Sequence, residues 1–351
     1  MKLLDLWGKT ADAGYHPALY HMLDTGHVAR AILECCPQWR KVAGAVLGDA
    51  AGCEDVTAYV AALHDLGKIS AAFQGQVEGE RARLESQGWS FVGWPTRASR
   101  HHTLLGQAAL LSDGAPDLGL GPLESVAGEV MGGHHGAWQT ACSLQDCAED
   151  VDLDEPPAFA EQRVAAVECL QATFAPSAPP RSIANVSAAS MFLTGLAILA
   201  DWIASDTRNF PAADHVPLDE YTDMSHQQAH DAVARMGLSA SPSASPTAFA
   251  DLFSSLTPRP LQRAVDSLDD HLLAQPSLTI MEAPTGEGKT EAALALAHRI
   301  GALRGTEAFY YALPTMATSN QMHTRVDDYL RDNLHLDAGV RLVHGLSLIH
   351  I

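Results

Sequence analysis

The chain has 351 residues, of which 47% are hydrophobic and 18% charged, so it is long enough for two domains that each bury a core. Its 42 acidic and 22 basic residues give a formal charge of -20, which excludes a protein that holds nucleic acid by diffuse attraction alone. The six cysteines form no CxxC pair and the N-terminus carries no signal-peptide core, so we expect a cytoplasmic protein.

The first 237 residues favour helices. Apolar residues recur at helical spacing in long segments, and strand signals are few. These segments are His27 to Cys36, Asp55 to Leu66, Thr103 to Leu111 and Ala160 to Phe174. We therefore predict an all-α bundle over residues 1–237.

One uncharged stretch, Ile183 to Ala200, is about as long as a membrane-spanning helix. Polar residues such as Asn185 and Thr194 interrupt it. A helix in the core of a bundle, apolar on every face, explains the same pattern. We expect that core helix and no membrane contact.

A run rich in serine, proline and alanine follows at Leu238 to Pro246, and it predicts a linker over residues 238–250. Short apolar strands then alternate with helices in residues 251–351, in a βαβαβ order. The predicted strands are 278–282, 308–313 and 340–343, and the predicted helices are 290–304 and 319–331. The second domain is thus predicted to be an incomplete α/β domain of the P-loop class.

Histidines and aspartates in the first domain have the chemistry of a hydrolytic transition-metal centre, because imidazole and carboxylate together bind such ions. Two ions need about six or more ligands, and the candidates are His21, His64, Asp65, His102, His134, His135 and Asp201. They lie in separate segments, as expected of a site inside a helix bundle. Gly132, Gly133 and Gly136 are predicted to free the backbone so that His134 and His135 aim into one cavity.

Five motifs in this region resemble the HD nuclease domain of the CRISPR-associated helicase-nuclease of type I interference systems. They are His21-Met-Leu-Asp-Thr25, His64-Asp-Leu-Gly-Lys68, His102-Thr-Leu-Leu-Gly106, Gly133-His-His-Gly136 and Ala200-Asp-Trp-Ile-Ala-Ser-Asp206. The resemblance implies an HD-type fold. It also implies that Asp65 bridges two ions, and that these are divalent transition-metal ions: Mn, Fe, Ni or Co.

The same resemblance distributes the ligands between the ions. It implies that His21, His64, Asp65 and Asp201 hold one ion, with Asp206 as the rival to Asp201, and that His102, His134 and His135 hold the second. Lys68, one helical turn after Asp65, is a candidate to neutralise phosphate charge, and the alternative is an exposed salt bridge to Asp65. His101, beside His102, stays ambiguous.

The second domain contains the phosphate-loop motif Ala283-Pro-Thr-Gly-Glu-Gly-Lys-Thr290. Gly286, Gly288 and Lys289 are expected to cradle phosphates, and Thr290 to bind the magnesium of Mg-ATP. The segment Thr257 to Gln262 is similar to the one that reads adenine in superfamily 2 helicases, so Gln262 joins the candidate set. The resemblance implies a RecA-like domain. Because no Asp-Glu box or second lobe follows, we expect no helicase activity from this chain and a less stable second domain.

By this resemblance, the chain is expected to be a metal-dependent nuclease that cuts single-stranded DNA and is recruited by the guide-RNA surveillance complex (Cascade). Two alternatives stay open at this point. One is an HD-type nucleotide or cyclic-nucleotide phosphohydrolase, because the ligand set alone does not distinguish the substrates. The other is a non-catalytic docking or nucleotide-binding fragment.

Overall fold

The computed structural model describes residues 2–11, 14–48, 52–91, 101–176, 183, 185–236, 247–305, 309–313 and 315–334. The chain divides into two compact units, residues 1–238 and 239–351. Most of the predicted linker, positions 238–246, lies outside the described residues, as does the predicted strand 340–343.

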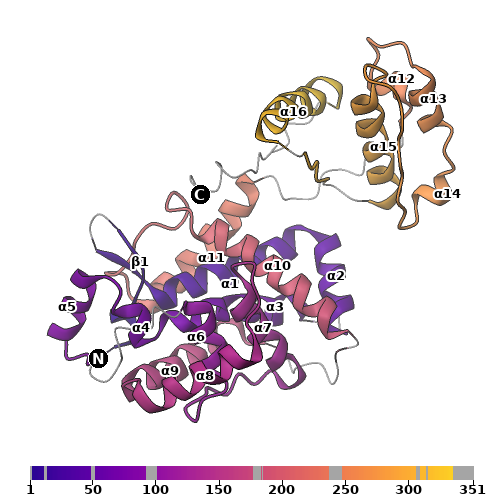
Figure 1. The fold of residues 1–351 in the computed structure, drawn as a ribbon. Helices are drawn as coiled ribbons and strands as arrows, with labels where there is room; N and C mark the ends of the chain where they lie inside the picture. Colours follow the sequence, from indigo (N-terminus) through magenta and orange to yellow (C-terminus); the bar gives the residue numbers. More distant parts are fainter. Residues whose placement is uncertain are drawn as a thin grey trace. The chain divides into compact units, whose positions relative to one another are not determined.

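The first unit is mostly helical (Figure 1). Its longer helices, in chain order, are α1 (Ala18–Cys35), α2 (Pro37–Leu47), α3 (Cys53–Ala62), α5 (Glu78–Ser86), α6 (His102–Ala109), α7 (Glu124–Gly133), α8 (Ala141–Asp154), α9 (Pro157–Phe174), α10 (Val186–Ala204) and α11 (Leu218–Arg235). Shorter turns are η1 (Leu3–Asp5), η2 (Leu63–Lys68), α4 (Ala71–Gln74) and η3 (Gly121–Leu123). The prediction of a helical first domain is confirmed.

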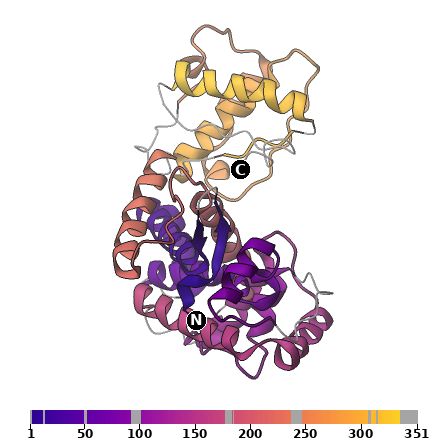
Figure 2. The same ribbon diagram turned by 90° about the vertical axis from the view of Figure 1, so that its left-hand side faces the viewer.

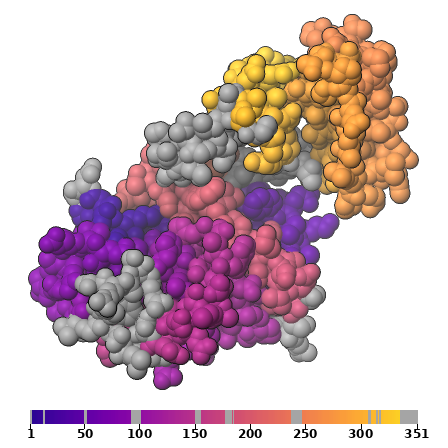
Figure 3. Space-filling model, in the orientation of Figure 1, coloured from indigo at the N-terminus to yellow at the C-terminus, as the bar shows by residue number. Residues whose placement is uncertain are grey.

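Helix α1 is the centre of this unit. Nearly all of its residues are buried, and α3, α10 and α11 pack against it (Figure 1). It ends at Cys35, and Pro37 then opens α2, where a missing N–H costs nothing because the first amides of a helix have no partner. The space-filling view shows segments that are far apart in the sequence lying side by side on one face of the unit (Figure 3). A buried central helix gives His21 a fixed position.

A small antiparallel sheet precedes α1, and the sequence did not predict it. Strands β1 (Trp7–Thr10) and β2 (Tyr15–Pro17) pair with an irregularity between Trp7 and Lys9 (Figure 2, indigo). Gln74 of α4 secures the sheet: it accepts a hydrogen bond from the backbone N of Trp7 (3.1 Å) and donates to the carbonyls of Trp7 (2.8 Å) and Lys68 (2.9 Å). The sheet is thereby attached to the end of η2.

Helix α10 is the one described helix that is long and apolar enough to cross a membrane. The expectation that it is buried on every face is wrong, because only 44% of its apolar window is buried. One face packs on α1, α3 and α7, whereas Met191 and Trp202 are exposed on another. A helix at the periphery of a bundle buries one stripe, and a composition without charges does not reveal which side faces the solvent.

The second unit is helical in its described residues. Its elements are α12 (Phe249–Leu252), α13 (Pro260–Asp266), α14 (Asp270–Leu273), α15 (Lys289–Arg304), α16 (Met316–Asp328) and the π-turn η4 (Tyr329–Asn333). The helix predicted after the phosphate loop is confirmed as α15. The helix predicted at 319–331 is present as α16, with η4 continuing it.

The strands predicted for this unit are wrong where they can be compared. Residues 278–282 and the described part of 308–313 form no strand, so a βαβαβ sheet is not observed in the described residues. A strand exists only through hydrogen bonds to a neighbouring strand, and these segments make none that define one. Leu278 and Ile280 are 88% and 76% exposed. Their apolar side chains lack the cover that a sheet would give them.

Candidate metal centre

The centre is built on the turn η2, which follows α3 directly. The helix tightens into a 3-10 turn here, and Asp65 leaves helical geometry with φ -103° and ψ 17°. In a 3-10 turn, side chains three residues apart eclipse one another. Lys68 Nζ accordingly lies 2.7 Å from Asp65 Oδ2, and both side chains are buried. The exposed salt bridge considered from the sequence is therefore a buried one.

Asp65 is the point on which the predicted ligands converge. Its Oδ2 lies 3.3 Å from His21 Nε2 and 3.2 Å from His64 Nε2. Its Oδ1 lies 3.2 Å from His102 Nε2 and 3.6 Å from His134 Nε2. Each carboxylate oxygen thus faces a different pair of imidazoles. This is the arrangement that a carboxylate bridging two cations requires.

Backbone carbonyls orient two of these imidazoles by contacting the ring nitrogen that faces away from Asp65. His64 Nδ1 lies 2.9 Å from the carbonyl oxygen of Ala61, and His134 Nδ1 lies 2.8 Å from that of Met131. Since a carbonyl only accepts, Nδ1 of each ring carries a proton. Nε2 of each ring then faces Asp65, and it is the atom that would bind a metal ion.

The backbone of α6 lies close against the turn η2. A Cβ on Gly67 would lie 1.9 Å from the carbonyl oxygen of His102 and 2.4 Å from the backbone N of Gly106. Only glycine fits at this contact, which places His102 beside Asp65. The predicted role of the other glycines needs correction: Gly132 and Gly133 belong to α7 and make room for the side chains of Gln107 and Trp138, and only Gly136 has a positive φ (85°).

The donor set fits divalent transition-metal ions. His21 Nε2, His64 Nε2, His134 Nε2 and Asp65 Oδ1 are buried without a hydrogen-bond partner among the described atoms. Buried polar atoms are normally satisfied, because an unsatisfied one costs about 1–3 kcal/mol. Orphaned nitrogens and a carboxylate oxygen that face one another are explained by a cation that accepts their lone pairs. Two overlapping ligand triads, His21–His64–Asp65 and Asp65–His102–His134, share the carboxylate.

Charges around the turn keep the carboxylates ionised. Burial raises the pKa of Asp65, but the charges of His64 and Lys68 outweigh burial and hold that pKa well below its ordinary value. Burial opposes ionisation of Asp201 as well, yet the close approach of His21 Nε2 to its Oδ1 lowers the pKa of Asp201 strongly. Burial lowers the pKa of His102 to about 4, so this ring is neutral near pH 7. Ionised carboxylates and neutral imidazoles are the forms that bind metals.

Asp201, from α10, completes the inner group. Its Oδ1 lies 2.9 Å from His21 Nε2 and 3.8 Å from His64 Nε2. The rival, Asp206, is instead paired with Arg208, with Oδ2 2.6 Å from Arg208 Nη2. The structure therefore brings Asp201 to the centre and leaves Asp206 at the surface.

Two further polar residues support Asp201, and sequence reasoning missed both. Ser205 Oγ donates to Asp201 Oδ1 (3.0 Å), and Lys9 Nζ donates to Ser205 Oγ (2.9 Å). Ser205 is four residues after Asp201 on the same helix, so helical spacing could have suggested it. Lys9 comes from β1, which no sequence signal places there. Burial, together with the charge of Lys68, lowers the pKa of Lys9 to about 8.

The adjacent histidines His134 and His135 face different partners. His134 Nε2 points to Asp65, whereas His135 Nε2 lies 3.2 Å from His102 Nε2. His101, the ambiguous residue, packs its ring 4.8 Å from that of His135. Sequence reasoning could not separate these roles, because the turn after α7 sets the direction of each ring.

The phosphate loop of the second unit opens α15. Gly286 and Gly288 have φ of 87° and 75°, in the left-handed region that favours glycine. Lys289 Nζ donates to the carbonyls of Ala283 (2.5 Å) and Pro284 (3.1 Å). Gln262 is buried and donates to the carbonyl of Gly288 (3.2 Å). The structure thus brings Gln262, Gly286, Gly288 and Lys289 together, with Thr290 in the first turn of the helix.

Comparison with known proteins shows which family this chain is similar to. The sequence model described as "Cas3, HD domain" matches residues 7–210. Over 361 aligned positions the chain is 31% identical to the CRISPR-associated endonuclease/helicase Cas3 of Thermus thermophilus, covering 99% of this chain and 38% of that protein. The chain thus spans less than two fifths of that relative's length.

Two solved structures extend the similarity. T. fusca Cas3 with ATP has a TM-score of 0.70 at 26% identity, over 99% of this chain and 39% of that one. A chain in a structure described as a CRISPR RNA-guided surveillance complex, pre-nicking, has a TM-score of 0.63 at 25% identity, over 94% of this chain and 38% of that one.

Proposed function

The chain belongs to the Cas3 family, and on this premise we propose that it is a divalent-metal-dependent nuclease that cuts single-stranded DNA in CRISPR antiviral defence. One observation carries the proposal: four imidazoles from α1, η2, α6 and the end of α7 converge within 3.6 Å of the two oxygens of one buried carboxylate, Asp65. A hydrolytic centre for phosphodiesters needs such a group of ligands.

The residues divide into two ligand sets for two ions. His21, His64, Asp65 and Asp201 would hold the first, and Asp65, His102, His134 and His135 would hold the second. Ions bound there would act as Lewis acids on a phosphodiester and lower the pKa of water. The native ion is proposed to be Mn, Fe, Ni or Co, since imidazole-rich sites suit transition metals.

The protein's own residues prepare this centre. The Ala61 and Met131 carbonyls fix the tautomers of His64 and His134, and Ser205 fixes the carboxylate of Asp201. The Lys68 ammonium is held by Asp65 and lies 5.6 Å above the ring of Phe73. From this position we assign to Lys68 the stabilisation of negative charge that develops on the phosphate.

The substrate and partner are proposed from the charge of the chain and from its relatives. With a net charge of -20, the protein does not attract DNA over long distances. A partner that delivers the strand would make long-range attraction of DNA unnecessary. A similar chain is part of a structure described as an RNA-guided surveillance complex. We infer that the guide-RNA surveillance complex, Cascade, brings single-stranded DNA to the centre.

For the second unit we propose part of a RecA-like domain that binds Mg-ATP. The left-handed glycines, Lys289 and the start of α15 support this assignment, as does the similarity to a Cas3 structure with ATP. We assign recognition of the base to Gln262, and its hydrogen bond to the carbonyl of Gly288 supports this role.

The decisive experiment compares substrates. The chain is incubated with Mn2+, Ni2+ or Co2+ and either a 5′-labelled single strand of DNA or deoxynucleotides and cyclic dinucleotides. We expect cleavage of the strand. Release of phosphate or triphosphate from the nucleotides, with the strand left intact, would overturn the assignment in favour of a nucleotide phosphohydrolase.

The matched variants are Asp65→Ala and Asp206→Ala. Removing the shared carboxylate forfeits several kcal/mol of transition-state stabilisation, which is about 10³-fold in rate or more. Asp206→Ala, at the Arg208 salt bridge, is expected to cleave as the unmodified chain does. Metal content, measured by elemental analysis, should fall only in Asp65→Ala. Equal cleavage by the two variants would refute the metal-centre mechanism.

A further inference from the structure

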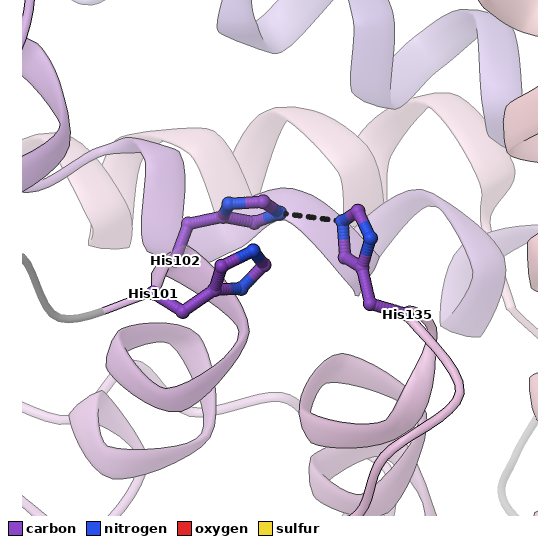
Figure 4. Close-up of side chains that lie close together, drawn as sticks. All are labelled: His101, His102 and His135. Carbon is purple, nitrogen blue, oxygen red and sulfur yellow. Dashed lines mark hydrogen bonds between the residues drawn. The ribbon is translucent and has the colours of Figure 1, made fainter. Parts of the chain in front are cut away.

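We propose that His101, His102 and His135 form an additional, outer cation position at the mouth of the metal centre, through which the second ion is loaded and exchanged. The proposal rests on the proposed function of the inner centre and extends it. Ligand atoms of these three histidines all lie within 4.8 Å of one another. Figure 4 shows the three rings converging, with His102 and His135 joined by a hydrogen bond.

The local backbone explains why the rings meet. His101 is the N-cap of α6 with extended geometry (φ -63°, ψ 140°), so its ring turns back beside that of His102, with centroids 4.4 Å apart. His135 comes from the turn after α7 and meets both rings nearly at right angles, at 83° and 76°. Rings in this arrangement can direct nitrogen lone pairs at one shared point.

A hydrogen-bond network holds the outer residues. His101 Nδ1 lies 2.9 Å from Thr103 Oγ1, and Gln139 Nε2 donates to that same hydroxyl (3.3 Å) and to the carbonyl of Gly132 (3.1 Å). His101 Nδ1 also accepts a long hydrogen bond from the backbone N of Thr103 (3.4 Å). In the tautomer that would bind a cation, Nδ1 carries the proton and donates to Thr103 Oγ1 in place of that long bond, and Nε2 then has a free lone pair. Partners of this kind orient metal-binding histidines in other proteins.

The outer triad continues the series of overlapping triads. The innermost is His21–His64–Asp65, the next is Asp65–His102–His134, and the outermost is His101–His102–His135. Asp65 joins the first two, and His102 joins the last two. The innermost side chains are buried, whereas His101 and His135 are exposed. The series therefore leads from solvent to the buried carboxylate.

His102 is the exchange point between the two outer positions. Its Nε2 lies 3.2 Å both from Asp65 Oδ1 and from His135 Nε2. One lone pair binds one ion at a time, so an ion at the outer position competes for both His102 and His135 with the second ion of the inner centre, whose proposed ligands include the two. The outer set contains only imidazoles, which suit Ni2+, Co2+, Zn2+ and Cu2+, whereas Mg2+ prefers oxygen ligands.

Ion binding to the full chain tests the proposal, with Ni2+ and Mg2+ as probes in calorimetric titrations. In an Asp65→Asn background, which removes the shared carboxylate and keeps its shape, we expect one weakly bound Ni2+ and no Mg2+ at the outer triad. Adding His101→Ala should weaken that Ni2+ by about tenfold or more. Adding His215→Ala, an exposed histidine beside Asp214, is the matched control and should change nothing.

A second measurement avoids the background variant. In the otherwise unmodified chain, a chelator should extract the more labile Ni2+ at a rate that His101→Ala alters about tenfold and His215→Ala leaves unchanged. If His101→Ala matches His215→Ala in both measurements, the outer position does not exist. If Asp65→Asn alone retains all ions at unmodified affinity, the proposed function fails instead, and a loss caused by His101→Ala would still support the outer position.

Discussion

The metal centre and the phosphate loop are built in opposite ways. The ligands of the centre come from segments between His21 and Asp201 and are mostly buried, whereas the loop is one short stretch, Ala283 to Thr290, with Gly286 and Lys289 exposed. The geometry of the centre depends on how α1, η2, α6, α7 and α10 pack. The geometry of the loop depends chiefly on its own backbone. Packing defects should therefore damage the first site and spare the second.

The largest effect is expected from Gly67→Ala. A Cβ here would overlap the backbone of α6, which cannot yield as a flexible side chain can. Overpacking of this kind costs about 3 kcal/mol or more. Urea unfolding of the first unit should shift accordingly, and Ni2+ binding should weaken with it, because His102 moves away from Asp65.

Gly195→Ala is the matched control for that substitution. Gly195 lies on α10, and a Cβ there would meet nothing within 4 Å. The variant should be unchanged or more stable by up to about 1 kcal/mol. Nucleotide affinity should stay constant in both variants. If Gly67→Ala lowered nucleotide affinity as much as it lowers Ni2+ affinity, the two sites would not differ in their dependence on packing.

A substitution in the loop should show the reverse pattern. In Lys289→Ala the ammonium that would meet phosphates is absent, so affinity for an ATP analogue should fall by about tenfold, or about 1.4 kcal/mol. Fluorescence anisotropy of a labelled analogue measures this. Metal content should be unaltered. Arg331→Ala, which removes a cation paired with Asp327 on the neighbouring turn, serves as the control; equal losses in the two variants would argue against a phosphate-binding loop.

The smallest effect concerns a buried histidine away from the ligands. Burial lowers the pKa of His27 from 6.5 to about 3, and neither ring nitrogen has a hydrogen-bond partner among the described residues. The unfolded chain gains a proton on this ring as pH falls below 6.5, while the folded chain does not. His27 therefore makes the folded state progressively less stable between pH 6.5 and about 3.

His27→Leu should remove this acid sensitivity. Thermal unfolding of the metal-free chain at pH 7.5 should differ by no more than about 1 kcal/mol from the unmodified protein, and the variant should become the more stable one near pH 5. His215→Gln, at an exposed site, should show no such crossover. Parallel pH profiles for His27→Leu and the unmodified chain would contradict the burial of an uncharged ring.

Features set by short stretches of chain were predictable. The helical segments of the first unit follow from apolar spacing, and the start of α15 follows from Gly288 and Lys289, because both depend on neighbours within a few residues. The candidate ligands were recognisable from their motifs, and all of those predicted near Asp65 lie there or beside His102. The phosphate-loop residues were recognisable in the same way.

Other features were decided by tertiary structure alone. The strand β1 brings Lys9 to Ser205 across the unit, and the approach of α6 to Gly67 sets which oxygen of Asp65 faces His102. The different directions of His134 and His135, and the exposure of Leu278 and Ile280, depend on which elements pack beside them. Sequence determines which donor atoms are present through the chemistry of each side chain. Only packing brings donors that are distant in the chain within a few ångströms of one another, because such contacts depend on every helix between them.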